Sequence, residues 1–180
     1  MHDDIERIAF TETDIKQRVN EIGKQITEDY KNLREEIFCV GILKGAAVFY
    51  TDLVRSIDLP IRFDFMIASS YGSGTKTSGA VKILKDLDYD IEEKHLIVIE
   101  DIIDSGTTMG YLLDYFTRRG AKSVKLCSLL NKPSRRTVEV KIDYCGFDVP
   151  DEFLVGYGLD YAEKYRNLPY IGVLKSEIYS

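Results

Sequence analysis

The sequence predicts a single α/β domain that spans residues 1–180 and is built on a parallel sheet. Short apolar runs, long enough for strands buried on both faces, alternate with helical patterns along the chain. This alternation favours parallel strands joined by right-handed crossovers. No internal repeat or linker-like stretch divides the chain, and 180 residues suffice to bury one sizeable core. In such sheets, ligands bind beyond the carboxyl ends of the strands.

The first half of the chain is predicted to hold two helices and two strands. Apolar residues recur at spacings of three and four across residues 11–33, which predicts a helix with one buried face. An apolar run over residues 37–43 predicts a buried strand, and residues 46–57 are predicted to be helical. Residues 61–68 alternate, so we expect a strand with one covered face. The covered set would be Ile61, Phe63, Phe65 and Ile67.

The second half continues the alternation, with one helix expected over residues 107–119. Strands are expected near residues 80–84, 96–100, 123–130, 152–157 and 170–174. The connecting segment 69–79 is polar and rich in Gly, Ser and Thr. Because it matches neither a Walker loop nor a dinucleotide-binding glycine pattern, two interpretations stay open: a flexible hairpin, or a lid over a reactive intermediate.

Composition and charge narrow the possible classes of function. A hydrophobic content of 44% and a charged content of 30% are typical of a globular protein. The net charge of −6 argues against nucleic acid as a partner. No apolar stretch approaches membrane-spanning length, and residues 1–10 lack the pattern of a secretory signal. We therefore expect a cytoplasmic protein, with its three cysteines as reduced thiols.

The most informative segment is residues 96–110, LIVIEDIIDSGTTMG. Glu100 and Asp101 stand where the buried strand is expected to end, and Asp104 follows after two apolar residues. Residues 105–108, Ser-Gly-Thr-Thr, then lead into a helix, and loop N–H groups and the helix dipole both favour an anion there. Carboxylates do not bind phosphate. Three acids beside an anion site therefore suggest a ligand with hydroxyls or a metal next to its phosphate, such as a sugar phosphate.

Two further groups are expected to face the same crevice. Lys132, Arg135 and Arg136 form a basic loop after a predicted strand, which makes a role in recognising an anion or a carbonyl credible. Phe153 lies in a segment that predicts a core strand and turn, and an aromatic ring near the crevice could also stack on a planar base.

These segments resemble the signature of the type I phosphoribosyltransferases. Over nearly the whole chain, the resemblance is to the bacterial hypoxanthine-guanine phosphoribosyltransferases. The matching segments are GILKGAAVFYTDL, SSYGSGTKTSG with the following VKILKDLD, IVIEDIIDSGTTM, SLLNKPSRR and PDEFLVGYGLDYAEKYRNLPYIGVL. The last segment is the most specific, since other type I members lack it. The resemblance implies a parallel-sheet core with a small hood region and a flexible lid loop.

The resemblance also implies an activity in purine salvage. The enzyme would be a pentosyltransferase that moves the phosphoribosyl group from phosphoribosyl diphosphate (PRPP) to hypoxanthine or guanine, giving IMP or GMP plus diphosphate. Mg²⁺ is the implied cofactor, and a homodimer or homotetramer the implied assembly. Two alternatives stay open, namely a xanthine-preferring transferase and a non-catalytic regulatory protein that binds phosphoribosyl groups on the same fold.

The family's residue roles carry over to the matching positions, with Asp104 at the position of the proposed general base for purine N7. The PRPP positions match Lys44, Gly45, Glu100, Asp101, Asp104, Ser105, Gly106, Thr107, Thr108 and Arg166. The purine positions match Lys132, Phe153 and Leu154, and the lid positions match Ser70 and Tyr71. The metal positions match Glu100, Asp101 and Asp160. The family often has a cis peptide bond between the positions of Lys44 and Gly45.

Overall fold

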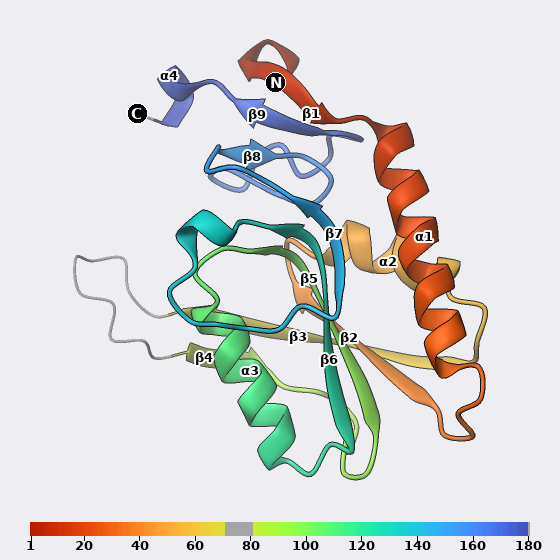
Figure 1. Ribbon diagram of the computed structural model, residues 1–180. Helices are drawn as coiled ribbons and strands as arrows, with labels where there is room; N and C mark the ends of the chain where they lie inside the picture. The colour runs from red at the N-terminus through yellow and green to blue at the C-terminus, as the bar shows by residue number, and fades with distance from the viewer. Residues whose placement is uncertain (71–80, 180) are drawn as a thin grey trace.

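The computed structural model describes residues 1–70 and 81–179, which form two sheets and the helices around them (Figure 1). The strands are β1 Ile5–Phe10, β2 Ile37–Leu43, β3 Ile61–Ser70, β4 Val81–Lys85, β5 His95–Ile103, β6 Ser123–Asn131, β7 Tyr144–Asp148, β8 Leu154–Val155 and β9 Ile171–Leu174. The α-helices are α1 Glu12–Tyr30, α2 Ala47–Ser56, α3 Thr107–Arg118 and α4 Ser176–Tyr179, with 3₁₀ turns at His2–Asp4 and Pro133–Arg135.

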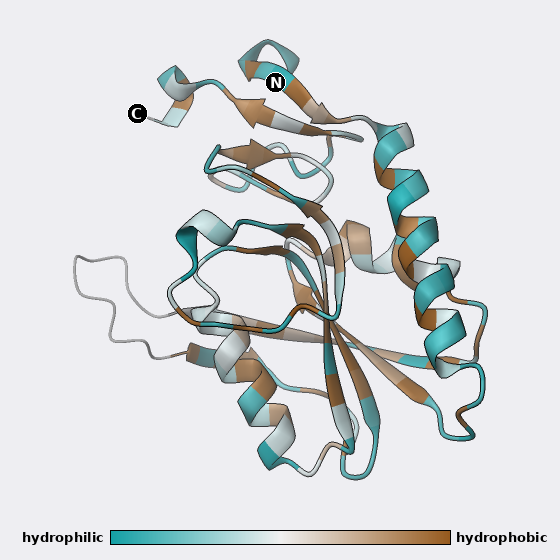
Figure 2. Ribbon diagram, viewed as in Figure 1, coloured by the Kyte–Doolittle hydropathy of each residue, from teal (hydrophilic) through white to brown (hydrophobic). Residues whose placement is uncertain are grey.

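The larger sheet confirms the predicted parallel α/β architecture. Its strands lie in the order β4-β3-β2-β5-β6-β7, and all neighbours are parallel except the antiparallel pair β3 and β4. Helices α1 and α2 cover one face with one apolar cluster, and α3 covers the other face with a second cluster (Figure 1). In Figure 2 the strands of this sheet are mostly hydrophobic, whereas hydrophobic and hydrophilic residues alternate along α1.

A smaller antiparallel sheet, in the order β1-β9-β8, forms the hood. It joins residues near both ends of the described chain and lies above the large sheet in the view of Figure 1. Residues beside β8 line a cavity together with residues from the carboxyl end of β5, so the hood closes over that end of the sheet. Among the described residues, no helix is long and apolar enough to cross a membrane.

The predicted first helix is confirmed, although it is shorter than the pattern suggested. Helix α1 begins after Thr11, whose side chain accepts from the Asp14 N–H while the Asp14 carboxylate accepts from the Thr11 N–H. This capping box satisfies N–H groups that have no partner within the helix. The helix ends at Tyr30, and the Leu33 N–H closes a turn onto the Tyr30 carbonyl oxygen.

The predicted covered face of β3 is wrong in part. Phe63, expected in the core, is 59% exposed, whereas Asp64 and Met66 of the opposite face are 8% and 0% exposed. The Tyr50 ring of the short helix α2 lies 4.6 Å from that of Phe65, whereas it meets the Phe63 ring only edge-on at 6.2 Å and leaves Phe63 exposed. Alternation gives the two faces of a strand but not which face its neighbours cover.

Candidate active site

Two adjacent carboxyl groups, Glu100 and Asp101, were predicted at the end of a strand and lie inside β5, because β5 continues to Ile103. Asp101 is only 8% exposed, and its Oδ1 accepts from the Ile102 N–H at 2.8 Å. Burial and the neighbouring Asp101 raise the pKa of Glu100 well above its ordinary value. Burial also raises the pKa of Asp101, although hydrogen bonds and the nearby Arg166 oppose this shift. Two carboxyl groups so placed favour a bound cation or a shared proton.

The loop after β2 comes into contact with this carboxyl pair. A Cβ atom added to Gly45 would lie 1.7 Å from Asp101 Oδ2, so only glycine fits there. Lys44 Nζ lies 2.9 Å from Glu163 Oε2 in an exposed ion pair. The expected cis peptide between Lys44 and Gly45 is wrong by one bond, since the cis bond is Leu43–Lys44. Outside proline, no residue pattern marks a cis bond, so its position could not be read from the sequence.

The loop between β5 and α3 has the form of an anion site. Gly106 is the N-cap of α3 with φ +80°, and a Cβ atom there would lie 2.2 Å from the Val138 carbonyl oxygen. The Thr107 N–H donates to Ser105 Oγ at 3.3 Å, and the Ser105 N–H donates to Asp104 Oδ1 at 2.5 Å. Glycine therefore lets the chain turn sharply into the helix, whose first-turn N–H groups favour an anion.

The segment after β6 supports this loop from the other side. The N–H groups of Thr137 and Val138 both donate to the Ser105 carbonyl oxygen at 2.9 Å. Arg136 Nε donates to the Asp104 carbonyl oxygen at 3.0 Å. From the sequence, Arg136 was predicted to help recognise a ligand. In the structure its guanidinium group instead binds the backbone of Asp104. The sequence could not predict this hydrogen bond, because Arg136 and Asp104 lie about thirty residues apart in the chain.

Lys132 is a buried cation at the carboxyl end of β6. It is 8% exposed, and its Nζ donates to the Glu152 carbonyl oxygen at 2.8 Å and lies 3.7 Å from Asp151 Oδ1. Burial, and then the positive charge of Arg135, lower the pKa of Lys132. The ammonium group is thus held beside the hood, where a hydrogen-bond acceptor would be a favourable partner.

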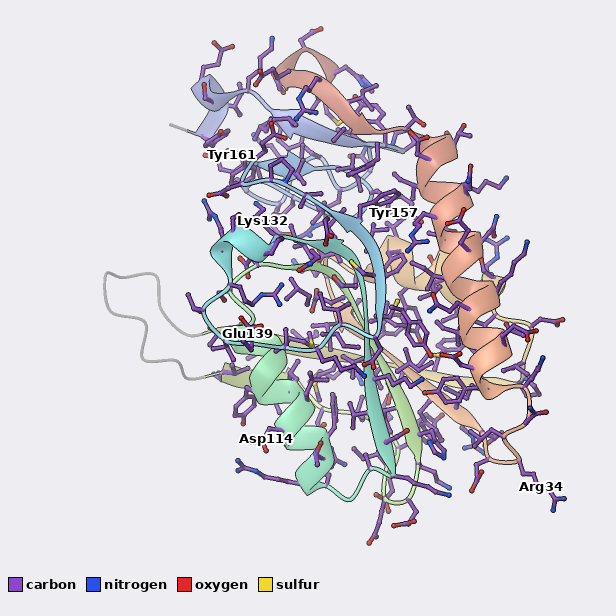
Figure 3. All side chains as sticks on the ribbon, viewed as in Figure 1. Arg34, Asp114, Lys132, Glu139, Tyr157 and Tyr161 are labelled. Atoms are coloured by element: carbon purple, nitrogen blue, oxygen red, sulfur yellow. The ribbon has the colours of Figure 1, made fainter. Side chains whose placement is uncertain are left out.

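Phe153 lies in an aromatic cluster at the edge of the hood, next to the buried Leu154. Its ring stacks on that of Tyr179 with centroids 4.8 Å apart, and meets Tyr161 edge-on at 5.5 Å. Tyr179, from α4, was not predicted as a site residue, since a single tyrosine near the end of the sequence has no motif around it. Phe153 and Tyr179 line the same cavity as Lys132. In Figure 3 Tyr161 lies on the same side of the molecule as Lys132.

Asp160 and Arg166 are brought together as an ion pair. Arg166 Nη2 lies 2.8 Å from Asp160 Oδ1, and Nη1 donates to the Gly158 carbonyl oxygen at 2.7 Å. Asp160 Oδ2 accepts from the Glu163 N–H at 2.9 Å. Over residues 1–70 and 81–179, no three His, Cys, Asp or Glu side chains gather into a metal site made by protein alone.

Two adjoining cavities of about 320 Å³ each hold most of the predicted site residues. The first is lined by Gly45, Glu100, Asp104, Gly106 and Thr108, among others. The second is lined by Asp101, Asp104, Lys132, Phe153, Leu154 and Asp160, among others. Asp104 and Ile102 line both cavities, so Asp104 stands at their boundary.

The remaining predicted residues lie beside these cavities or outside the description. Four of them are next to a lining residue in the sequence or are bonded to one: Lys44, Ser105, Thr107 and Arg166. Ser70 ends β3, and the lid residue Tyr71 lies outside the described residues. A larger cavity of about 570 Å³ lies between α1, α2 and residues 157–169, and Arg166 is its one predicted site residue.

Comparison with known proteins identifies the family. The phosphoribosyl transferase domain model matches residues 10–162. A hypoxanthine-guanine phosphoribosyltransferase of Bacillus subtilis is 51% identical over 99% of this chain and 98% of its own length. A bifunctional protein TilS/HprT of Listeria monocytogenes is 53% identical over the whole chain, which spans 28% of that protein's length.

Solved structures agree. The structure of a hypoxanthine phosphoribosyltransferase from Staphylococcus aureus superposes with a TM-score of 0.95 at 47% identity, covering 100% of this chain and 97% of that one. The chain thus belongs to the phosphoribosyl transferase domain family and, within it, to the hypoxanthine-guanine phosphoribosyltransferases.

Proposed function

We propose that this protein transfers the phosphoribosyl group from PRPP to hypoxanthine or guanine, giving IMP or GMP and diphosphate. The observation that carries the proposal is the position of Asp104. It lies at the boundary between a cavity that ends at an anion-binding loop and a cavity that holds a buried lysine and an aromatic ring. A sugar phosphate in the first cavity and a planar base in the second would meet beside its carboxylate.

The second cavity suits a 6-oxopurine. The Lys132 ammonium group can donate hydrogen bonds but cannot accept them, so it favours a carbonyl oxygen over an amino group. The Phe153 ring offers a face on which a planar base can stack. Leu154 is buried beside it and would present backbone groups to the edge of the base. Relatives that share this chain's full length are named for hypoxanthine and guanine, which supports the same choice.

The first cavity suits a ribose phosphate with Mg²⁺. The Ser105–Thr108 loop would hold the 5′-phosphate, and Glu100 and Asp101 would face the ribose hydroxyls and the metal. Mg²⁺ needs only one or two protein carboxylates when substrate phosphates and waters complete its shell. Burial raises the pKa of both groups, and the neighbouring Asp101 raises that of Glu100 further, so a bound cation would favour their charged forms; this supports an ion beside these two residues. Asp160 is the third candidate contact. When bound, Mg²⁺ supplies positive charge to the departing diphosphate.

Different residues of the chain would act on the leaving diphosphate and on the purine base. Departure of diphosphate builds positive charge on the ribose ring, and Lys44 and Arg166 would stabilise the leaving anion. The purine nitrogen attacks C1 of the ribose, and Asp104 takes the proton from N7. Arg136 Nε donates to the Asp104 carbonyl oxygen and the Ser105 N–H donates to Asp104 Oδ1, so both the backbone and the carboxylate of Asp104 are held at the boundary of the cavities.

The test is a steady-state comparison of hypoxanthine, guanine, xanthine, adenine and uracil with PRPP and Mg²⁺, with the nucleotide product identified by mass. We expect turnover with hypoxanthine or guanine that requires Mg²⁺. Faster turnover with xanthine would favour the xanthine-preferring alternative. Equal or better turnover with adenine or uracil would contradict the 6-oxopurine pocket, and PRPP binding without turnover of any base would indicate a regulatory protein.

We also propose a homodimer or homotetramer. Phe63 and Leu84 are 59% and 58% exposed on neighbouring strands, and Val48 of α2 is 36% exposed. We infer that Phe63 and Leu84 contribute to one apolar patch, and a large exposed apolar patch is typical of a protein interface. A second copy of the chain would cover them.

A further inference from the structure

Three successive residues in the loop after β8 have positive φ, and the middle one is a tyrosine. Gly156, Tyr157 and Gly158 have φ of +99°, +51° and +103°. Glycine adopts this region freely, whereas a bulky residue rarely does and is kept there by its surroundings. The Tyr157 N–H donates to the Leu168 carbonyl oxygen at 2.9 Å, which fixes the backbone. The conformation of the loop therefore fixes the direction of the Tyr157 side chain, and the partner of that side chain indicates its role.

Tyr157 binds the helix that follows the Lys44–Gly45 loop. Its hydroxyl donates to Asp52 Oδ2 of α2 at 2.7 Å, and its side chain is only 7% exposed. In Figure 3 Tyr157 lies on the side of the molecule that α1 covers, away from Lys132. Burial and the Asp52 carboxylate raise the pKa of the Tyr157 hydroxyl, so it remains a donor at neutral pH. The bond thus joins the loop after β8 to α2.

The next residue makes a second connection between the same two segments. A Cβ atom on Gly158 would lie 2.1 Å from the Gly45 carbonyl oxygen, so the two backbones touch. The Gly158 carbonyl oxygen accepts from Arg166 Nη1 at 2.7 Å, and Arg166 pairs with Asp160. Tyr157 is therefore one residue away from the point where the Lys44–Gly45 loop, Arg166 and Asp160 are held together.

We propose that Tyr157, through its bond to Asp52, is a positioning residue for the diphosphate side of the active site. It touches neither cavity that would hold the ribose phosphate and the base, and acts by holding Gly158, and with it Arg166 and Asp160, against Gly45. The inference rests on the proposed function, because it assigns these groups to PRPP and diphosphate. It predicts an effect confined to these ligands, since Lys132 and Phe153 are held by other contacts.

The test compares Tyr157→Phe with wild type. Loss of one hydrogen bond to a charged acceptor should raise KM for PRPP about three- to tenfold, while KM for hypoxanthine changes by less than about twofold. The dissociation constant of inorganic diphosphate with Mg²⁺, measured by calorimetry, should rise by a similar factor. Asp52→Ala should raise KM for PRPP as Tyr157→Phe does, whereas Asp52→Asn should stay near wild type because it keeps a hydrogen-bond acceptor. The double variant Tyr157→Phe/Asp52→Ala should have a KM for PRPP no higher than that of either single variant.

Tyr144→Phe is a matched control for loss of stability. The Tyr144 hydroxyl donates to Asp29 Oδ2 of α1, also at 2.7 Å, and Tyr144 is also buried, but it lies at the start of β7 and lines neither cavity. The variant Tyr144→Phe should lower the urea midpoint of unfolding and leave KM for PRPP unchanged.

The inference is overturned if Tyr157→Phe leaves KM for PRPP unchanged, or if both substrates' KM values rise together as in a general loosening. A rise of the same size in Tyr144→Phe would overturn it too. Failure of the proposed function would look different, because wild type itself would then neither bind diphosphate nor turn over any base.

Discussion

Lys132 illustrates how much a single residue can reveal before a structure exists. Its place after a predicted strand indicated that it would face the crevice, and it does line the second cavity. Its burial and its bond to the Glu152 carbonyl oxygen could not be predicted, because both depend on a segment twenty residues later. The same holds for Arg136 and Tyr179, whose partners lie far along the chain. Residue type and spacing predict chemistry, whereas long-range partners need the folded chain.

Lys132→Ala tests the base preference. Loss of a charged hydrogen bond to the purine oxygen should cost about 1.5–3 kcal/mol, so kcat/KM for hypoxanthine should fall roughly 10- to 150-fold. Adenine offers no oxygen there, so the preference for hypoxanthine over adenine should shrink. Steady-state kinetics with both bases measure this. Lys141→Ala, at a side chain that is 85% exposed, should change neither value. Unchanged selectivity in Lys132→Ala would remove Lys132 from the base pocket.

Among the elements, the unit of β5 and α3 was the easiest to predict. Its apolar run, acids and hydroxyl-rich loop are local signals, and they predicted the strand and the helix that follows it, although β5 extends three residues further to Ile103. Strands β1 and β7 were missed. The first pairs with β9, about 160 residues away, and its alternation is weak, while the second lies in a stretch whose Asp and Gly residues favour a turn.

The carboxyl pair on β5 makes stability depend on pH. A glutamate side chain in an unfolded chain has a pKa of about 4.3. Burial raises the pKa of Glu100 in the folded protein above this value. The folded state therefore binds more protons, so the stability contributed by protonated Glu100 is present at low pH and lost as pH rises through the folded pKa.

Glu100→Gln should therefore be more stable than wild type at pH 8 without metal, and close to wild type at pH 4. Urea unfolding in the presence of a chelator at both pH values measures this, with the exposed Glu139→Gln as the control. Added Mg²⁺ should stabilise wild type more than Glu100→Gln. A difference between wild type and Glu100→Gln that is the same at both pH values would contradict the buried-charge explanation.

At the scale of the whole molecule, the hood shares one apolar cluster with α1, α2 and the large sheet and has a smaller cluster of its own, and the site lies where hood and sheet meet. We propose that residues 1–180 act as one domain, because β1 leads directly into α1 of the large sheet's cover while pairing with β9 of the hood. The sequence predicted one domain from length and the absence of a linker. It could not predict that Phe63 stays exposed while Phe65, on the same face of β3, is covered, since that depends on the position of Tyr50 in α2.

Phe63→Ser tests whether a second copy covers this face. Removal of an aromatic side chain from an interface should weaken association, so the mass measured by light scattering should fall toward that of a monomer at micromolar concentration. Tyr111→Ser removes an aromatic ring that is 42% exposed on α3, over the opposite face, and should leave the mass unchanged. A wild-type protein that is already monomeric would contradict the proposed assembly.

The central claim is that the chemistry takes place beside Asp104, between the two cavities. Asp104→Asn keeps the size of the side chain and removes the proton acceptor, and general-base catalysis contributes roughly 10²- to 10⁴-fold. We predict that the single-turnover rate with hypoxanthine falls within that range while PRPP binding changes little, because in the proposed site the loop N–H groups would hold the phosphate. Asp114→Asn, on the exposed surface of α3, should keep the wild-type rate. A wild-type single-turnover rate in Asp104→Asn would contradict the account, because slow product release cannot hide the loss in that measurement.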